Sequence, residues 1–168
     1  MTTHRGWFGA FAWMIATLSA CAHAPQPGTA ATAISSLPAE QAIKFVVLPA
    51  ESNVFTKAAQ ATNNSLLHAQ VGGLGVAQVS KVSLEVVQLA IECVEPSLTC
   101  YEAVGHSLAA NDLLFAQISA VTPQQLKVTI TLFDVDAKAP RTRAEKVFAS
   151  EEEATAGIAE LVAEVTRP

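Results

Sequence analysis

Three cysteines are the residues of this 168-residue chain best suited to chemistry, because a thiolate can act as a nucleophile, form a disulfide or bind a metal. Cys21 stands alone near the amino terminus, whereas Cys93 and Cys100 are separated by only six residues. This spacing predicts two roles. Cys21 is available for modification on its own, and the other two cysteines can act as a pair.

The segment before Cys21 predicts export and attachment of lipid. A positively charged start is followed by an apolar run over residues 7–18 that contains no carboxylate, which is typical of a signal peptide. The run is shorter than the roughly 20 apolar residues of a membrane-spanning helix. Leu18-Ser19-Ala20-Cys21 resembles a lipobox, in which the cysteine thiol takes a diacylglycerol before cleavage. The alternative is an ordinary secretory signal, cut near Ala20 or Ala24, with an incidental cysteine.

Three segments follow from this pattern. Residues 1–20 are expected to be the signal peptide, and residues 21–42 the lipidated cysteine with a flexible linker. The linker is rich in Ala, Pro, Thr and Ser and has no hydrophobic period, so it cannot bury enough surface to become ordered. Residues 43–168 have the size of one domain. Cleavage would leave nine basic and fifteen acidic residues, a formal charge of −6, so we expect no binding of nucleic acid.

Short apolar runs alternate with helical spacings along the domain, which predicts an α/β fold. The predicted strands are residues 44–49, 75–79, 112–119, 126–135 and 144–149. The expected helix caps are Ser52, Ser83, Thr99 and Ser150, with Glu102 and Glu153 completing capping boxes for the last two. Gly72-Gly73 is expected to end the first helix and Pro96 the second. The predicted order is β-α-β-α-α-β-β-β-α.

Short connections between the last three strands predict an antiparallel meander. In the middle strand, Thr129 and Thr131 alternate with Val128, Ile130 and Leu132. This alternation predicts that much of the strand buries one face and exposes the other to solvent.

A disulfide between Cys93 and Cys100 is expected, because exported chains meet an oxidising compartment. Closing this small loop would stabilise the domain by roughly 2 to 3 kcal/mol in the chain-entropy model. Two alternatives remain open. The cysteines can be free thiols, or they can be half of a metal site whose other two ligands are missing from the pattern.

Other side chains with reactive groups do not form a recognisable catalytic pattern. His68 and His106 lie on predicted helices, where an isolated histidine is more often a surface or packing residue than a ligand. Asp134 and Asp136 can share a cation at a strand end, although two carboxylates at this spacing are more typical of a solvated hairpin. We therefore expect no metal, no cofactor and no enzymatic activity.

A weak candidate for a binding crevice follows the first strand. Open α/β sheets bind ligands beyond the carboxyl ends of their strands, which places Glu51, Ser52 and Asn53 near such a crevice. The same residue types are ordinary at the start of a helix. Both interpretations remain open from the sequence.

The segment from Cys93 to Gln117, followed by Val128 to Val135, resembles the TolB amino-terminal-like domains of bacterial lipoproteins, which are related to the curli-secretion lipoprotein CsgG. The family pattern is a cysteine pair, a helix, a step into a strand, and a later strand that ends in aspartate, here Asp134. The resemblance implies a three-layer sandwich around one mixed five-stranded sheet of order 2-1-3-4-5, in which the fourth strand is antiparallel.

These features predict a lipoprotein of the cell envelope that carries a lipid such as palmitate on Cys21. Alanine rather than aspartate at position 22 resembles Gram-negative lipoproteins of the outer membrane, facing the periplasm. We expect a non-enzymatic module that binds an envelope protein through a sheet edge or a helix face, as an accessory of an assembly or transport system. The alternative is a subunit of an oligomeric secretion or scaffold complex, and an exported enzyme is the third class.

Overall fold

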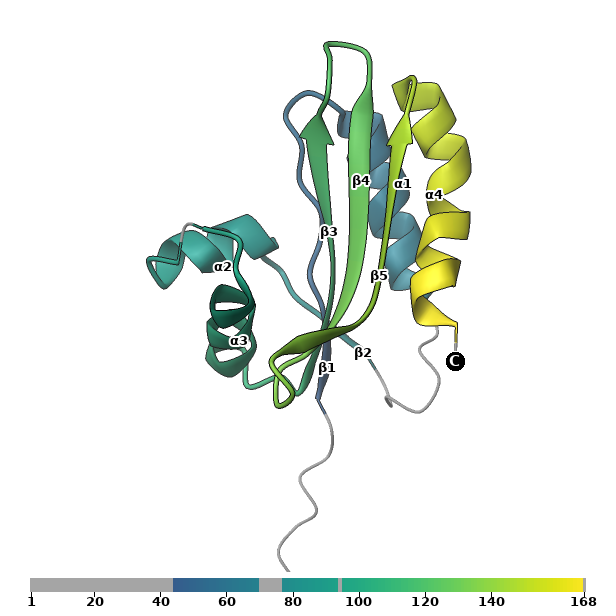
Figure 1. Ribbon diagram of the computed structural model, residues 1–168. Helices are drawn as coiled ribbons and strands as arrows, with labels where there is room; N and C mark the ends of the chain where they lie inside the picture. Colours follow the sequence, from purple (N-terminus) through teal and green to yellow (C-terminus); the bar gives the residue numbers. More distant parts are fainter. Residues whose placement is uncertain (1–43, 70–76, 94, 168) are drawn as a thin grey trace, which may run out of the picture. The chain divides into compact units, whose positions relative to one another are not determined.

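Strand β1 (Phe45–Val47) is an interior strand of the sheet, and all three of its residues are buried. The computed structural model describes residues 44–69, 77–93 and 95–167 (Figure 1). The expected signal peptide, the lipobox with Cys21, the linker and Gly72-Gly73 lie outside the described residues. In the described part, no helix is both long enough and apolar enough to cross a membrane.

The predicted order of elements and the predicted sheet topology are confirmed. The elements after β1 are α1 (Thr56–Leu67), β2 (Ala77–Val79), α2 (Leu84–Ala90), α3 (Leu98–Ser107), β3 (Asp112–Ala120), β4 (Leu126–Asp134), β5 (Ala139–Phe148) and α4 (Glu151–Thr166). The sheet order is β2-β1-β3-β4-β5. Strand β1 is parallel to β2 and β3, and β4 is antiparallel to both of its neighbours.

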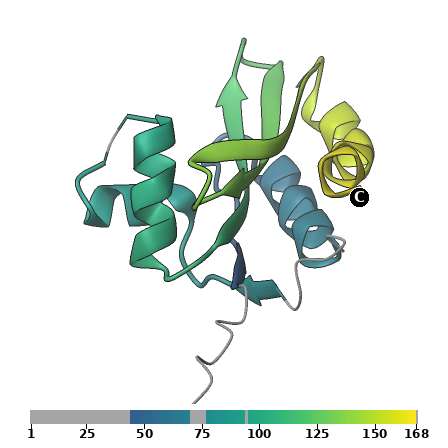
Figure 2. The same cartoon turned by 60° about the horizontal axis from the view of Figure 1, so that its bottom comes forward.

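Helices cover both faces of the sheet, which gives the predicted three layers. Successive residues of a strand point to opposite faces. Phe45 and Val47 therefore join the core shared with α1 and α4, whereas Val46 and Leu48 join the core shared with α2 and α3. Figures 1 and 2 show α1 and α4 on one side of the sheet and α2 and α3 on the other.

The predicted cap of α1 is wrong. The helix begins at Thr56, and its N-cap position is Phe55, which has no side-chain acceptor. Ser52 instead accepts from the backbone N–H groups of Val54 and Phe55, at 3.3 and 2.9 Å, and so stabilises a turn before the helix. Its hydroxyl is too far back in the chain to reach the first helical turn.

Helix α1 is capped by a residue of α4. The Glu151 carboxylate accepts from the N–H groups of Lys57 and Ala58, at 2.7 and 3.1 Å. These are two of the N–H groups that a helix leaves without an internal partner. Glu151, which is 94 positions from Lys57 in the sequence, therefore replaces the local cap that most helices have.

Helix α2 starts as predicted but ends earlier. The Ser83 hydroxyl accepts from the N–H of Val86, which confirms this cap. The helix stops at Ala90, because Glu92 takes a positive φ of 58° and turns the chain out of the helical path before Pro96 is reached.

The expected capping box of α3 is also wrong. Ser97, two residues before Thr99, is the cap, and its hydroxyl accepts from the N–H of Cys100 at 3.2 Å. The Glu102 carboxylate does not reach back, because it pairs with Lys138 at 2.8 Å. That ion pair is the largest of several causes that lower the pKa of Glu102.

The capping box of α4 is present in a shifted form. Ser150 accepts from the N–H of Glu153, and the Glu153 carboxylate accepts from Ala149, one residue before the cap. The predicted inward face of the helix is confirmed, since Ala154, Ile158, Leu161 and Val165 are all buried. This face closes the core below β4 and β5.

Strand β4 is buried on both faces along most of its length, contrary to the prediction. Thr129 and Thr131 are each 5% exposed, and their partners in the register of β5 are Glu145 and Arg143. Thr129 donates to the Glu145 carboxylate of β5 at 3.2 Å, which satisfies its hydroxyl. Strand β5 also starts five residues earlier than predicted, with a bulge opposite Leu132 and Phe133.

Candidate functional site

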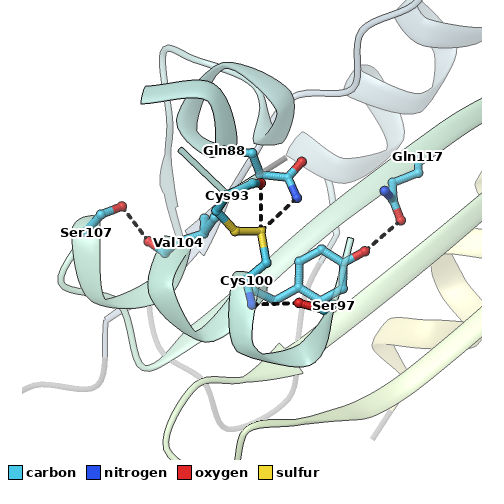
Figure 3. Close-up of a disulfide and its surroundings, with 8 residues drawn as sticks. Gln88, Cys93, Ser97, Cys100, Val104, Ser107 and Gln117 are labelled. Carbon is cyan, nitrogen blue, oxygen red and sulfur yellow. Dashed lines mark hydrogen bonds between the residues drawn. A yellow bond between two sulfur atoms is a disulfide. The ribbon is translucent and has the colours of Figure 1, made fainter. Parts of the chain in front are cut away.

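A disulfide joins the connection after α2 to the first turn of α3 (Figure 3). The Cα atoms of Cys93 and Cys100 are 5.6 Å apart, within the usual range for a disulfide. Cys100 is 4% exposed, whereas Cys93 is partly exposed. Gln88, which is buried, donates its side-chain N–H to Cys100 Sγ at 3.2 Å.

An open hollow of about 450 Å³ lies beside the disulfide, and both cysteines contribute to its wall. Glu92 and Glu95 are exposed and lie on the same wall. Ser97 and Thr99 complete its polar lining. The hollow therefore combines a covalent sulfur pair with negative charge.

The crevice predicted at Glu51, Ser52 and Asn53 coincides with an open hollow of about 360 Å³ between the end of β1 and α1. Several polar groups around this hollow form hydrogen bonds within the loop between β1 and α1, or between that loop and α1. Asn63 of α1 accepts from Ala50 N–H at 2.7 Å and donates to Ala50 O at 3.1 Å, and Ser52 stabilises the turn. The arrangement fixes the loop on α1, and its polar side chains do not converge on one point.

Asp112, the first residue of β3, has a buried carboxylate at the end of the sheet opposite the crevice. The sequence did not indicate this residue as a candidate. Asp112 is fully buried, and Arg141 Nε lies 2.8 Å from its Oδ1 atom. Apart from this ion pair, neither carboxylate oxygen of Asp112 has a hydrogen-bond partner in the described part of the chain. Burial raises the pKa of Asp112, Arg141 opposes this effect, and the carboxylates of Asp134 and Asp136 add to the increase.

Asp134 and Asp136, considered above as a cation pair, have protein partners. Asp134 accepts from Ala137 N–H at 2.8 Å and pairs with the Arg141 guanidinium at 2.8 Å. Asp136 accepts from the Asn111 amide at 3.2 Å. The bulge in β5 places Arg141 between Asp112 and Asp134, so the cluster stabilises this corner of the sheet.

The two histidines of the domain lie at separate places. His106 Nε2 is 3.5 Å from Oε1 of Glu102, which lies one turn earlier in α3. The Glu102 carboxylate also pairs with Lys138. His68, just after α1, lines an open groove of about 410 Å³ between α1 and α4 whose walls include Ala159 and Val162. The structure does not bring the histidines together with the cysteines.

Exposed apolar side chains are concentrated around α2. Nine large apolar residues of the described chain are exposed, and five of them lie between positions 79 and 98. Val86 and Leu89, 42% and 65% exposed, are three residues apart in α2 and so share its outer face. Val82 precedes the helix, and Val79 is exposed in the edge strand β2. We refer to Val79, Val82, Val86 and Leu89 as the α2 surface.

The sequence contains the signal for this surface. A helix that packs against a sheet needs one apolar face, which Leu84 and Val87 provide in α2. Val86 and Leu89 make the other face apolar as well, and Glu85 is the single charged residue within the helix. These side chains are not used in packing against the sheet, so the outer face of α2 is a candidate interaction surface.

Comparison with known proteins gives structural likeness only. No protein-family model matches the chain, and no curated protein matches it. The chain is similar to the LpoB C-terminal domain from Salmonella enterica, with 11% identity, a TM-score of 0.41, and coverage of 65% of this chain and 84% of that one.

Two further solved structures resemble the chain. They are lipoprotein GNA1162 from Neisseria meningitidis, with 10% identity, a TM-score of 0.39 and coverage of 75% and 99%, and TolB from Acinetobacter baumannii, with 15% identity, a TM-score of 0.37 and coverage of 76% and 29%. The likenesses thus include a bacterial lipoprotein and TolB, while none of these three structures is a curli-secretion protein. At these values, they place the chain in no family and assign it no function.

Proposed function

We propose that this protein is a lipid-anchored envelope protein that binds a partner protein through the α2 surface, without catalysing a reaction. Support for the anchor comes from Leu18-Ser19-Ala20-Cys21 after a short apolar segment. The outer membrane, facing the periplasm, is the proposed location, because residue 22 is alanine.

The observation that carries the binding proposal is the excess of apolar surface on α2. Val86 and Leu89 lie outside both hydrophobic cores and are largely exposed. Strand β2, which precedes α2 in the chain, is a short sheet edge without a charged residue, whereas β5, the opposite edge, carries Arg141, Arg143, Glu145 and Lys146. Charged edge strands resist pairing with other proteins, so the β2 side is the better place for a partner.

The anchor is tested by comparing the native chain with Cys21→Ser, each expressed with its own signal. We expect the native protein to gain diacylglycerol, lose residues 1–20 and fractionate with membranes, and the variant to do none of these. Equal unmodified masses and a soluble native protein would contradict the anchor. Intact mass and membrane flotation are the measurements.

The α2 surface is tested by photo-crosslinking in membranes from the native chain. A photoreactive residue at Leu89 should capture one defined partner, and Val86→Glu should weaken that capture without changing the circular dichroism spectrum. The same residue at Val147, 51% exposed on β5, is the matched control and should not capture it. Equal capture at both positions contradicts the proposal. Crosslinking to its own chain, with a multiple of the monomer mass by light scattering, would indicate the oligomeric alternative.

A further inference from the structure

We propose that the Cys93–Cys100 disulfide is a thiol-exchange site, at which a small neutral or cationic thiol attacks Cys93 and releases Cys100. This inference is independent of the proposed function. It depends on the different surroundings of the two sulfur atoms and on the charge of the hollow beside them (Figure 3).

Access favours attack on Cys93. In thiol–disulfide exchange, the attacking sulfur approaches one sulfur atom from the side opposite the other, along the line of the bond. Cys100 is 4% exposed, and the buried Gln88 contacts its Sγ atom. Cys93 is partly exposed on the wall of the hollow. Both cysteines line the hollow, but Cys93 is the more exposed of the two, so we expect a small thiol to attack Cys93 in the folded protein.

The protein stabilises Cys100 as the leaving group. Cys100 is the third residue of the ten-residue helix α3, where the positive end of the helix dipole favours a thiolate. Gln88 donates an N–H to the same sulfur at 3.2 Å. Cys93 lies between α2 and α3 and belongs to neither helix. A sulfur whose thiolate is stabilised leaves faster, so the helix dipole and the Gln88 N–H add to the preference set by access.

Atoms and electrons balance in this exchange with the external thiol as the single added reactant. The external thiolate forms a bond to Cys93 Sγ, and the Cys93–Cys100 bond breaks with its electron pair on Cys100 Sγ. The attacking sulfur is oxidised to the disulfide level, and Cys100 is reduced to a thiolate, which takes a proton from water according to pH. The product is a mixed disulfide on Cys93 and one free thiol within the fold.

The charge of the hollow selects the class of thiol. Glu92 and Glu95 line it, and both are exposed. Two carboxylates near the path of approach repel an anionic thiol and attract a cationic one, an effect that salt screens. Cysteamine and mercaptoethanesulfonate, which have opposite charges beside similar thiols, are therefore suitable probes.

The site of attack is tested on the full chain carrying Cys21→Ser, in which Cys93 and Cys100 are the only cysteines. The oxidised protein is mixed briefly with cysteamine, quenched with acid and mapped by tandem mass spectrometry. We expect the adduct on Cys93 in at least about tenfold excess over Cys100, at a rate proportional to cysteamine concentration. Equal labelling, labelling of Cys100, or a rate limited by global unfolding would overturn the proposal.

The roles of the surrounding residues are tested by variants. Glu92→Gln with Glu95→Gln should lower the rate ratio of cysteamine to mercaptoethanesulfonate on the order of fivefold at low ionic strength, and much less in 1 M salt. Gln88→Met should slow exchange severalfold, whereas Gln78→Met, an exposed glutamine on β2, should not. An unchanged ratio rules out charge selection, and a wild-type rate in Gln88→Met rules out leaving-group stabilisation.

Discussion

The cap that Glu151 provides to α1 gives a prediction that separates tertiary from local control of a helix. Glu151 Oε1 accepts from Lys57 N–H at 2.7 Å and Ala58 N–H at 3.1 Å. Loss of a helix cap costs about 1 kcal/mol and up to about 2 kcal/mol, and a charged acceptor is at the stronger end of that range. We therefore expect Glu151→Ala to lower the free energy of unfolding by about 1.5 to 2 kcal/mol.

Two further variants identify the source of that loss. Glu151→Gln keeps an oxygen that accepts both N–H groups but removes the charge, so it should cost about 0.5 to 1 kcal/mol. Glu152→Ala is the matched control, because Glu152 lies in the same first turn of α4 but is exposed to solvent. It reports the loss of a carboxylate near the α4 dipole, which should lower the free energy of unfolding much less than the loss of the cap does.

Urea unfolding followed by circular dichroism measures these differences. The midpoint should decrease with an unchanged m-value, and the melting temperature should fall by about 4 °C for each kcal/mol. Hydrogen exchange at the amides of Lys57 and Ala58 should accelerate in Glu151→Ala, because both lose their acceptor. If Glu151→Ala costs no more than Glu152→Ala, the cross-helix cap has no energetic role and the reasoning is refuted.

Three other predictions concern packing, pH and the disulfide. Gly105→Ala should cost about 2 kcal/mol or more in urea unfolding, because the new Cβ would lie 2.3 Å from a Val135 methyl group. Asp112 has a raised pKa in the fold, so its contribution to stability is complete below its unfolded pKa of about 3.9 and is lost as pH rises through the folded value. The free energy of unfolding of the wild type should therefore fall relative to that of Asp112→Asn as the pH rises through the folded pKa. Parallel curves of unfolding free energy against pH for the two proteins would contradict this. Reducing the Cys93–Cys100 disulfide should lower the free energy of unfolding by about 2 to 3 kcal/mol. An unchanged midpoint of urea unfolding after reduction would exclude this stabilisation.

The order of elements along the chain could be predicted from the sequence because its determinants are local, whereas the sheet order 2-1-3-4-5 was implied by the resemblance to the TolB amino-terminal-like domains. The apolar run before Pro49 and the short connections between β3, β4 and β5 specify a buried strand early in the chain and a later meander. The pairing of Cys93 with Cys100 could be expected because exported chains meet an oxidising compartment. Elements of this kind need no information about distant contacts.

The caps and the solvent-exposed face of β4 could not be predicted, because distant residues determine them. Ser52 has the right type for a cap, but the acceptor for α1 is Glu151, on another helix. Thr129 has the right alternation for a wet face, but Glu145 of β5 covers it. In both cases the interaction joins residues that are distant in the sequence. Spacing along the chain therefore does not indicate which residue is the partner.

The α2 surface shows a third limit, which concerns function. Leu84 and Val87 on one face of α2, and Val86 and Leu89 on the other, are all apolar in sequence, so periodicity alone cannot say which face packs on the sheet. The fold assigns Leu84 and Val87 to the core and leaves the other pair exposed. Because one face already satisfies packing, the second face is not explained by folding. An exposed apolar face costs solubility, and for this reason we propose that a partner covers the α2 surface.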